Sequence, residues 1–342
     1  MFFKRISLCA AAMVAASAMV LSGCSSSDAG VDDSESTSAS PTSFVTPRTM
    51  PAGKGSGAAD GVFPRTVKHF KGETDVAAAP KRVVVISTGQ ADALLTLGVV
   101  PVGSTSGDGA ALVPKYLYNA FPDRKAELDR VADVGSRFEP SLEAVANLKP
   151  DLILMNKAGK DSDKLYASLA AMAPTVVTQG TGLYWKQDLL LLADALGKRD
   201  QAQTWLDEYQ NDAADFGKTV DGSPTVSFLR KNGDRLRVFG VASFSGSVAE
   251  DAGLARPQTQ WFTDETSHDI SNEQLDQADA DWIFYGVQGG DTGAVTGAPL
   301  WKTLQAVSDE HAVAVDDDVF YLNVGPTAAR EVLDQLRAKL GR

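Results

Sequence analysis

A short pattern that occurs twice constrains the fold of this chain more than any other feature. Residues 141–154 read SLEAVANLKPDLIL, and residues 271–284 read SNEQLDQADADWIF. Each copy predicts a short capped helix, a polar corner and a buried strand. The copies align without a gap, and the matched polar pairs are Ser141 and Ser271, Glu143 and Glu273, and Asp151 and Asp281. The repeat predicts two lobes built on one plan, each carrying a glutamate at the same place.

Strands and helices alternate on both sides of a long helical stretch. The run RVVVIS at residues 82–87 is rich in β-branched residues, as in strands that are buried on both faces. Such alternation predicts parallel sheets with right-handed crossovers. Residues 185–219 have helical periodicity and no strand signal, so we place the boundary between the lobes there. Beyond it, NGD at 232–234 predicts a hairpin, and VFYLN at 319–323 predicts a strand.

The first residues predict export. Lys4 and Arg5 precede an apolar run that ends in LSGC at residues 21–24, which is the pattern of a signal peptide. LSGC resembles the bacterial lipobox, in which the cysteine, here Cys24, becomes lipid-modified after cleavage. A plain signal anchor is the alternative. The other cysteine, Cys9, lies in the segment to be removed, so the mature domain would contain no thiol for a disulfide, a nucleophile or a metal site.

Composition changes along the chain set the remaining boundaries. The stretch after the signal is rich in Ser, Thr, Asp and Gly and has few large apolar residues, which predicts a disordered tether. The predicted parts are a signal peptide at 1–23, the tether at 24–66, an N-terminal lobe at 67–197, an interlobe helix at 198–220 and a C-terminal lobe at 221–342. The formal net charge of -12 argues against a nucleic-acid partner, which would need a basic face.

An ordered set of motifs resembles a known family. The segments PKRVVVIS, ADALLTLGVVPVG, SLEAVANLKPDLIL, LAAMAPTVV, FSGSVAEDAGL and ISNEQLDQADADWIFYG are similar to the ferric-siderophore branch of the periplasmic-type substrate-binding proteins. These proteins serve ABC importers for ferric siderophores, haem and cobalamin. The resemblance runs from about Pro80 to the C-terminus. It implies an α/β fold with two Rossmann-like lobes, joined by a single long rigid helix, with a ligand cleft between the lobes.

The resemblance also gives the repeated glutamates a role. In this family, a glutamate on each lobe contacts arginines of the membrane permease, and the matching positions are Glu143 and Glu273. The alternative is structural, because Ser followed by Glu is favourable at a helix start. We expect docking to a permease dimer, since capping alone does not explain the matched register.

Candidate ligand residues lie in loops that follow predicted strands, where α/β proteins bind their ligands. A bulky and often anionic ferric siderophore calls for arginines and aromatic side chains. The candidates are Arg137, Arg230, Tyr184, Trp185, Trp261 and Phe244. Each has a structural alternative: Arg230 as a surface charge at a strand end, for example, and Trp185 as a core residue. Phe244 stands in a loop where some catecholate binders have an arginine, which weakens a catecholate assignment.

Other ligands and other classes of protein remain as alternatives. Haem would need an iron-ligating His or Tyr. Of the three histidines, His69 precedes the predicted fold, His311 opens a predicted strand, and His268 is a possible ligand with no evident partner. Cobalamin stays open. No spacing of His, Asp and Glu indicates a resident metal, and the DDD at 316–318 fits a solvated strand end. No nucleophile or metal motif indicates an enzyme. A cell-envelope lipoprotein that has kept the fold and lost transport is the third class.

The sequence therefore predicts the extracytoplasmic solute-binding component of an ABC importer for iron. We expect it to be a monomer, anchored by lipid to the outer face of the cytoplasmic membrane. We expect it to capture an iron(III)–siderophore complex as its ligand, to need no cofactor, and to deliver the ligand to the permease.

Overall fold

The computed structural model describes residues 44–107 and 109–341. The predicted signal peptide, Cys24 and the first part of the predicted tether lie outside the described residues. Within the described ranges, no helix combines the length and the apolar character needed to span a membrane. Residues 44–342 form one compact unit that contains both lobes.

The N-terminal lobe is built on a five-stranded parallel sheet with the strand order β5-β4-β3-β6-β7. Its strands are β3 (Val83–Val85), β4 (Gly103–Ser106), β5 (Ala132–Ser136), β6 (Leu152–Asn156) and β7 (Thr175–Thr178). The predicted run RVVVIS supplies β3, which is buried on both faces. Helices between the strands are α1 (Gln90–Thr96), α2 (Lys115–Ala120), α3 (Lys125–Leu128), α4 (Leu142–Asn147) and α5 (Ser162–Ala170).

The C-terminal lobe has a five-stranded mixed sheet with the order β10-β9-β8-β11-β12. Its strands are β8 (Val226–Asn232), β9 (Arg235–Phe239), β10 (Ser267–Ile270), β11 (Trp282–Val287) and β12 (Ala312–Val315). Strand β9 runs antiparallel to both neighbours, and the predicted NGD hairpin joins it to β8. The helices are α8 (Phe244–Asp251), α9 (Gly293–Thr296), α10 (Gln305–Ser308) and α11 (Pro326–Leu340), and a short 3-10 segment covers Asn272–Ala278.

The repeated pattern occupies equivalent places in the two lobes. Its strand is β6 beside β3 in one sheet, and β11 beside β8 in the other. The carboxylate of Asp151 accepts hydrogen bonds from two backbone N–H groups just before β3, those of Lys81 and Arg82, both at 2.8 Å. Asp281 likewise accepts from the backbone N–H of Thr225, just before β8, at 2.7 Å. Each aspartate therefore fixes the entry to the neighbouring parallel strand, and the prediction of two lobes on one plan is confirmed.

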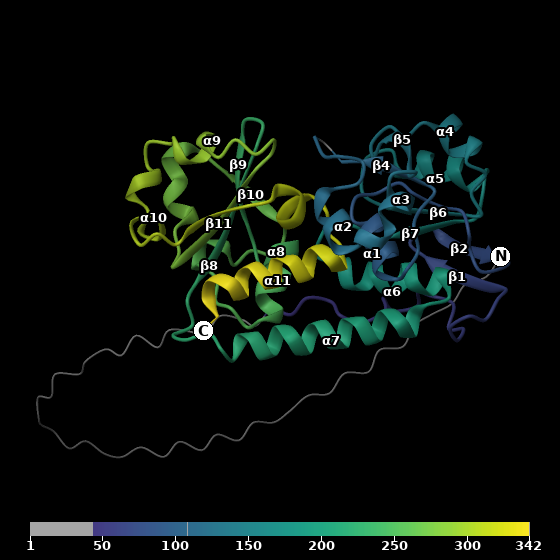
Figure 1. Ribbon diagram of the computed structural model, residues 1–342, viewed down its shortest axis with the longest axis horizontal. Helices are drawn as coiled ribbons and strands as arrows, with labels where there is room; N and C mark the ends of the chain where they lie inside the picture. The colour runs from purple at the N-terminus through teal and green to yellow at the C-terminus, as the bar shows by residue number, and fades with distance from the viewer. Residues whose placement is uncertain (1–43, 108, 342) are drawn as a thin grey trace, which may run out of the picture. The chain divides into compact units, whose positions relative to one another are not determined.

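Three helices join the lobes through one shared core. Helix α6 (Trp185–Leu196) is almost wholly buried, and its buried residues include the charged side chains of Lys186 and Asp194 beside a run of leucines. Helix α7 (Arg199–Gly217) packs on α6 and on α8, and α11 contacts α1 of one lobe and α8 of the other (Figure 1). A single cluster of buried residues includes Val85, Leu190, Tyr209, Phe228 and Leu333. The α/β fold with two lobes and a long interlobe helix agrees with the sequence prediction.

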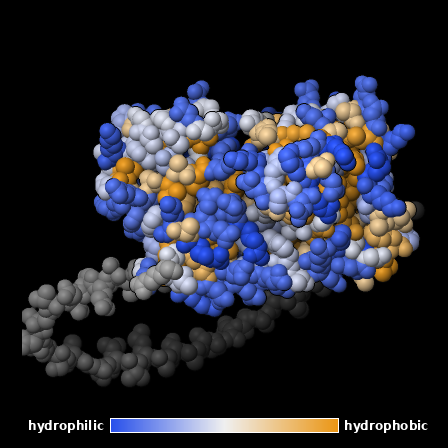
Figure 2. All heavy atoms as spheres, in the orientation of Figure 1, coloured by the Kyte–Doolittle hydropathy of each residue, from blue (hydrophilic) through white to orange (hydrophobic). Residues whose placement is uncertain are grey.

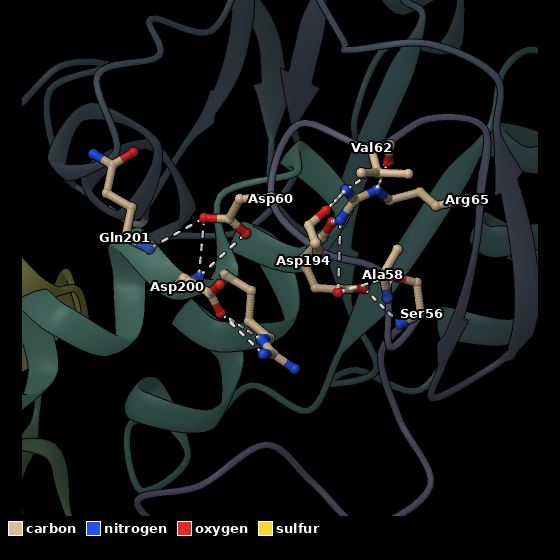
Figure 3. Close-up of polar contacts among 10 residues, drawn as sticks. Ser56, Ala58, Asp60, Val62, Arg65, Asp194, Asp200 and Gln201 are labelled. Atoms are coloured by element: carbon tan, nitrogen blue, oxygen red, sulfur yellow. Dashed lines mark hydrogen bonds and ion pairs between the residues drawn. The ribbon is translucent and has the colours of Figure 1, made fainter.

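Residues 44–64 form an ordered segment, the N-terminal strap, that packs on the helices. The predicted tether, 24–66, therefore ends too late in the sequence. The strap leads into a hairpin of β1 (Arg65–His69) and β2 (Gly72–Val76). The backbone N–H of Ser56 donates to Asp194 of α6 at 2.7 Å, and Asp60 accepts from the first N–H groups of α7 (Figure 3). The guanidinium of Arg65 donates to the Asp194 carbonyl at 2.7 Å. Polar contacts to buried partners order this apolar-poor segment, and composition alone does not reveal such partners.

One predicted strand is wrong. The segment VFYLN does not pair with β12 but forms a π-helical turn over Asp318–Leu322. The apolar run that suggested a strand instead buries four successive side chains in this turn, Val319 to Leu322. The turn matters for function because it brings two aromatic rings to the space between the lobes.

Candidate ligand-binding cleft

A cavity of about 280 Å³ lies between the two lobes. Its described lining from the N-terminal lobe is Thr88, Arg137, Asn156, Ala158, Thr181 and Gly182. Its lining from the C-terminal lobe is Arg230, Arg237, Phe239, Ser243, Phe244, Thr266, Phe320, Tyr321, Leu322 and Val324. Three arginines and a group of aromatic rings therefore face one space, and no Asp or Glu is among these lining residues.

The topology explains why these residues meet. In the N-terminal lobe, Thr88, Asn156 and Thr181 stand at or just beyond the carboxyl ends of β3, β6 and β7. Arg137 directly follows β5. Parallel strands end at the same edge of a sheet, so their following loops share one place, which is where ligands of such folds bind. The expected position of the cleft is thus found.

Arg230 is held by a carboxylate. Its Nε and Nη2 donate to the two oxygens of Asp317, each at 2.6 Å, in the fork geometry that suits a guanidinium and a carboxylate. Both side chains are largely buried, at 7% and 13% exposure. The ion pair fixes the direction of the Arg230 side chain. The negative charge of Asp317 balances the positive charge of Arg230 within the protein. Arg230 lines the cavity, and its contact with a ligand stays a prediction.

Arg237 is a cleft arginine that the sequence interpretation missed. It is the direct cross-strand partner of Arg230 in the β8–β9 hairpin. Its Nε is buried and has no hydrogen-bond partner among the described residues. Burial first, and then the positive charges of Arg230 and Arg235, lower the pKa of Arg237 to about 10. The NGD turn could have revealed this residue, because the hairpin register it sets places Arg237 opposite Arg230.

Aromatic rings form the apolar wall of the cavity. Phe239 and Tyr321 pack with ring centroids 4.9 Å apart, and the Tyr321 hydroxyl donates to the carbonyl of Phe284 at 2.7 Å. Gly286 of β11 makes room for this ring, since a Cβ there would lie 2.6 Å from Tyr321. Phe244 closes the base of the cavity and is 4% exposed. The wall offers flat apolar contact beside the arginines.

Arg137, Arg230 and Phe244 line the cavity as predicted, and the other three candidates do not. Trp185 lies in the core, where its Nε1 donates to Ser247 at 3.0 Å. Trp261 is half-buried and donates to the carbonyl of Arg256. Tyr184 is half-buried at the start of α6. All three were predicted in cleft loops, but none of them is among the lining residues of this cavity.

The histidines lie away from the cavity lining. His69 contacts Thr74 within the β1–β2 hairpin, His268 stacks on Phe262, and His311 stacks on Trp282. Across residues 44–107 and 109–341, no group of three His, Cys, Asp or Glu side chains is arranged to hold a metal ion.

The two repeated glutamates are exposed in the first turns of equivalent segments. Glu143 follows Ser141, whose hydroxyl accepts from the N–H of Ala144 at 3.2 Å and caps α4. Glu273 follows Ser271, and a hydrogen bond with the Ser271 side chain lowers the pKa of Glu273. Both carboxylates are therefore presented to solvent from capped, fixed helical turns.

Comparison with known proteins identifies the family. The family model described as periplasmic binding protein matches residues 83–319. The chain belongs to this family. A relative in Bacillus subtilis (strain 168), the probable siderophore-binding lipoprotein YfiY, is 34% identical over 295 residues, covering 80% of this chain and 86% of YfiY. The iron(3+)-hydroxamate-binding protein FhuD of the same organism is 31% identical over 271 residues, covering 75% of this chain and 80% of FhuD.

A solved structure has the same fold. The crystal structure of Staphylococcus aureus SirA complexed with staphyloferrin B superposes with a TM-score of 0.70 at 27% identity, covering 80% of this chain and 98% of SirA. The family resemblance inferred from the ordered motifs is confirmed, and the family is one of solute-binding proteins.

Proposed function

We propose that this protein is the extracytoplasmic solute-binding component of an ABC importer and that it captures a ferric siderophore in the cleft between its lobes. The observation that carries the proposal is the convergence of Arg137, Arg230 and Arg237 with an aromatic wall in one interlobe cavity. Relatives with this fold bear names that refer to siderophores, ferric citrate and hydroxamates. A ferric siderophore offers both anionic oxygens and apolar surface, which match the two halves of the cavity.

The cavity fits haem less well. Haem-binding proteins hold the iron through an axial side chain such as His or Tyr. The described lining contains no histidine, and the hydroxyl of its one tyrosine, Tyr321, is already bonded to the Phe284 carbonyl. An uncharged corrinoid would supply no anion to Arg237, whose buried Nε has no hydrogen-bond partner among the described residues. Haem and cobalamin are therefore included in the binding test as alternative ligands.

The shared core supports a small closing motion. Lobes that hinge freely are joined by exposed linkers with few contacts. Here α6, α7 and α11 belong to one buried cluster that includes strands of both sheets. Ligand capture would then proceed by local adjustment around the cavity, and the two exposed glutamates would keep a nearly fixed separation.

We further propose that Glu143 and Glu273 dock onto a permease dimer, one glutamate for each subunit, and that the chain is a monomer held at the outer face of the membrane through Cys24. The support is the equivalent placement of both glutamates in the two lobes and their exposure. Hydrophilic side chains predominate on the face shown in Figure 2, and hydrophobic residues appear there in several separate groups, as expected for a protein that docks reversibly through polar contacts.

Ligand binding is tested by titrating the purified protein with ferric hydroxamate, catecholate and citrate complexes and with haem and cobalamin. Trp185 stacks edge-on against Phe244 at 6.0 Å, so its fluorescence reports on the base of the cavity. Saturable quenching by one class of ferric complex is expected. Quenching by haem alone, or no response from a folded protein, would contradict the proposed ligand.

Docking is tested with the double variant Glu143→Lys and Glu273→Lys. We expect iron uptake by cells to be lost while ligand affinity stays within about twofold, because exposed charges far from a site contribute little to binding there. The matched control is Glu208→Lys, an exposed glutamate on α7, which Figure 1 shows on the opposite side of the molecule from α4. Normal uptake by the double variant, or equal loss in the control, would refute the docking role.

A further inference from the structure

Two arginines face each other on neighbouring strands in the cleft. Arg230 of β8 and Arg237 of β9 are register partners, and both line the cavity. Like charges directly opposite one another on a sheet destabilise it. The hairpin turn does not require this pair, because any two residues could occupy the register position.

The local carboxylates do not neutralise the pair. Asp317 binds Arg230 through both of its oxygens, and Asp269 binds the exposed Arg235 with its Oδ1 3.0 Å from the guanidinium. Asp317 and Asp269 are thus engaged by other arginines, and the Nε of Arg237 is buried with no acceptor in the described part of the chain. Burial and the neighbouring arginines lower the pKa of Arg237 to about 10, against the opposite effect of Asp269 and Asp317, so the side chain is charged at neutral pH. A partly desolvated guanidinium with a buried, unbonded Nε is stabilised when a ligand supplies an anion.

The surroundings determine what kind of anion fits. The guanidinium of Arg237 lies 5.4 Å from the centroid of the Phe239 ring, and Phe244 and Thr266 line the same cavity. A guanidinium binds a carboxylate through two parallel hydrogen bonds. With three arginines and one aspartate, the group of charged side chains around the cavity is net positive.

We propose that the cleft selects ferric complexes with net negative charge, and that Arg237, opposite Arg230, binds a carboxylate of the ligand. This inference rests on the proposed function and narrows its substrate class to carboxylate-bearing siderophores. Asp317 has a positioning role, because it holds Arg230 in a fixed direction and leaves Arg237 as the charge to be matched by the ligand.

The test compares three ferric probes of different charge by fluorescence titration of the purified protein. The probes are iron(III) citrate, which is anionic, ferrichrome, which is neutral, and ferrioxamine B, which is cationic. We expect iron(III) citrate to bind most tightly, with an affinity that falls as salt is added. Arg237→Gln should weaken its binding by about 10- to 100-fold, the loss expected for a charged hydrogen bond, and should leave any weak binding of ferrichrome unchanged. Arg237→Lys should give an intermediate affinity, because it keeps the charge and loses the fork.

Arg235→Gln is the matched control. Arg235 lies two residues away on the same strand face, has the same charge, and is exposed outside the cavity lining. Arg235→Gln should change the affinity for iron(III) citrate by less than about twofold, because Arg235 belongs to an exposed ion pair, and such pairs contribute little. The melting temperature of the empty protein separates a ligand role from a structural one. Arg237→Gln should melt at the same temperature as the parent or higher, since it removes a like-charge contact.

Three results would overturn the inference. Equal or tighter binding of ferrichrome or ferrioxamine B, with no effect of Arg237→Gln, would refute the substrate class and leave the proposed function standing. A lower melting temperature for Arg237→Gln, with weaker binding of every probe, would show a structural role. No binding of any ferric probe would contradict the inference and the proposed function together.

Discussion

A buried ion pair joins helices α6 and α8. Removing its acidic partner should destabilise the fold more than removing its basic partner. The Nζ of Lys186 in α6 lies 2.5 Å from Oδ2 of Asp251 at the end of α8, and both side chains are 0% exposed. Arg48 of the N-terminal strap also contacts Asp251, at 3.1 Å, and Thr46 accepts a hydrogen bond from Lys186 at 2.9 Å. Asp251 therefore forms ion pairs with two cations, Lys186 and Arg48. Besides Asp251, Lys186 has one further hydrogen-bond partner among the described residues, the hydroxyl of Thr46.

Burial outweighs attraction at this pair. It lowers the pKa of Lys186 and raises the pKa of Asp251, although each group's charge acts in the opposite direction on the other. A buried pair of this kind holds geometry more than it adds stability. Asp251→Asn, which leaves the Lys186 charge buried without a counter-charge, should lower the free energy of unfolding by about 3–5 kcal/mol. Lys186→Met should cost less, because Arg48 still compensates Asp251.

A double-mutant cycle adds the single variant Asp251→Leu and the double variant Lys186→Met with Asp251→Leu to the parent and Lys186→Met. Replacing both charges with apolar groups of similar size should bring stability back to within about 1 kcal/mol of the parent, or above it. Urea unfolding followed by tryptophan fluorescence measures these four proteins and Asp251→Asn. If the double variant were as unstable as the sum of the singles, or if Asp251→Asn cost less than about 1 kcal/mol, the assignment of a large desolvation cost to this pair would be refuted.

Three further predictions follow from single positions. Asp92→Ala should destabilise the fold by about 2–4 kcal/mol in urea unfolding, because this buried carboxylate accepts the first N–H groups of α11, at 2.8 and 2.9 Å, and its loss leaves them unpaired. Gly286→Ala should weaken ligand binding in the fluorescence titration, because the added Cβ displaces the ring of Tyr321 from the cavity wall. Burial and neighbouring aspartates raise the pKa of Asp318 to about 6 from 3.8, so this group's contribution to stability is lost as pH rises through that interval, and Asp318→Asn should flatten the change in urea midpoint between pH 4 and pH 7.

Much of the architecture follows from local pattern. The repeat fixed the two equivalent strand positions because each copy carries the same cap and the same aspartate corner, and the NGD turn set the β8–β9 hairpin. The π-helical turn at Asp318–Leu322 was missed because its apolar run satisfies a strand pattern equally well. Only contact with the aromatic core of the other elements decides between the two, and that contact is not visible in the segment itself.

The site was predictable to the extent that charge and topology decide it. Arg137 directly follows β5, and Arg230 lies in the last half of β8, so both are near strand ends that meet at the cleft, and the alternation of elements predicts these positions. Arg237 follows from hairpin register, which the sequence contains. Trp185 and Trp261 were misassigned because the direction of an aromatic side chain in a loop depends on partners far along the chain, such as Ser247 for Trp185.

The central claim is that an iron complex binds in the cavity between the lobes, against the arginines. A crystal structure of the protein grown with iron(III) citrate, with diffraction collected at the iron absorption edge, tests it most directly. The account predicts an anomalous peak for iron inside the cavity, with a ligand carboxylate against Arg237 and the ring of Tyr321 nearby. A peak at another surface, or an empty cavity in a protein that binds the complex in solution, would contradict it.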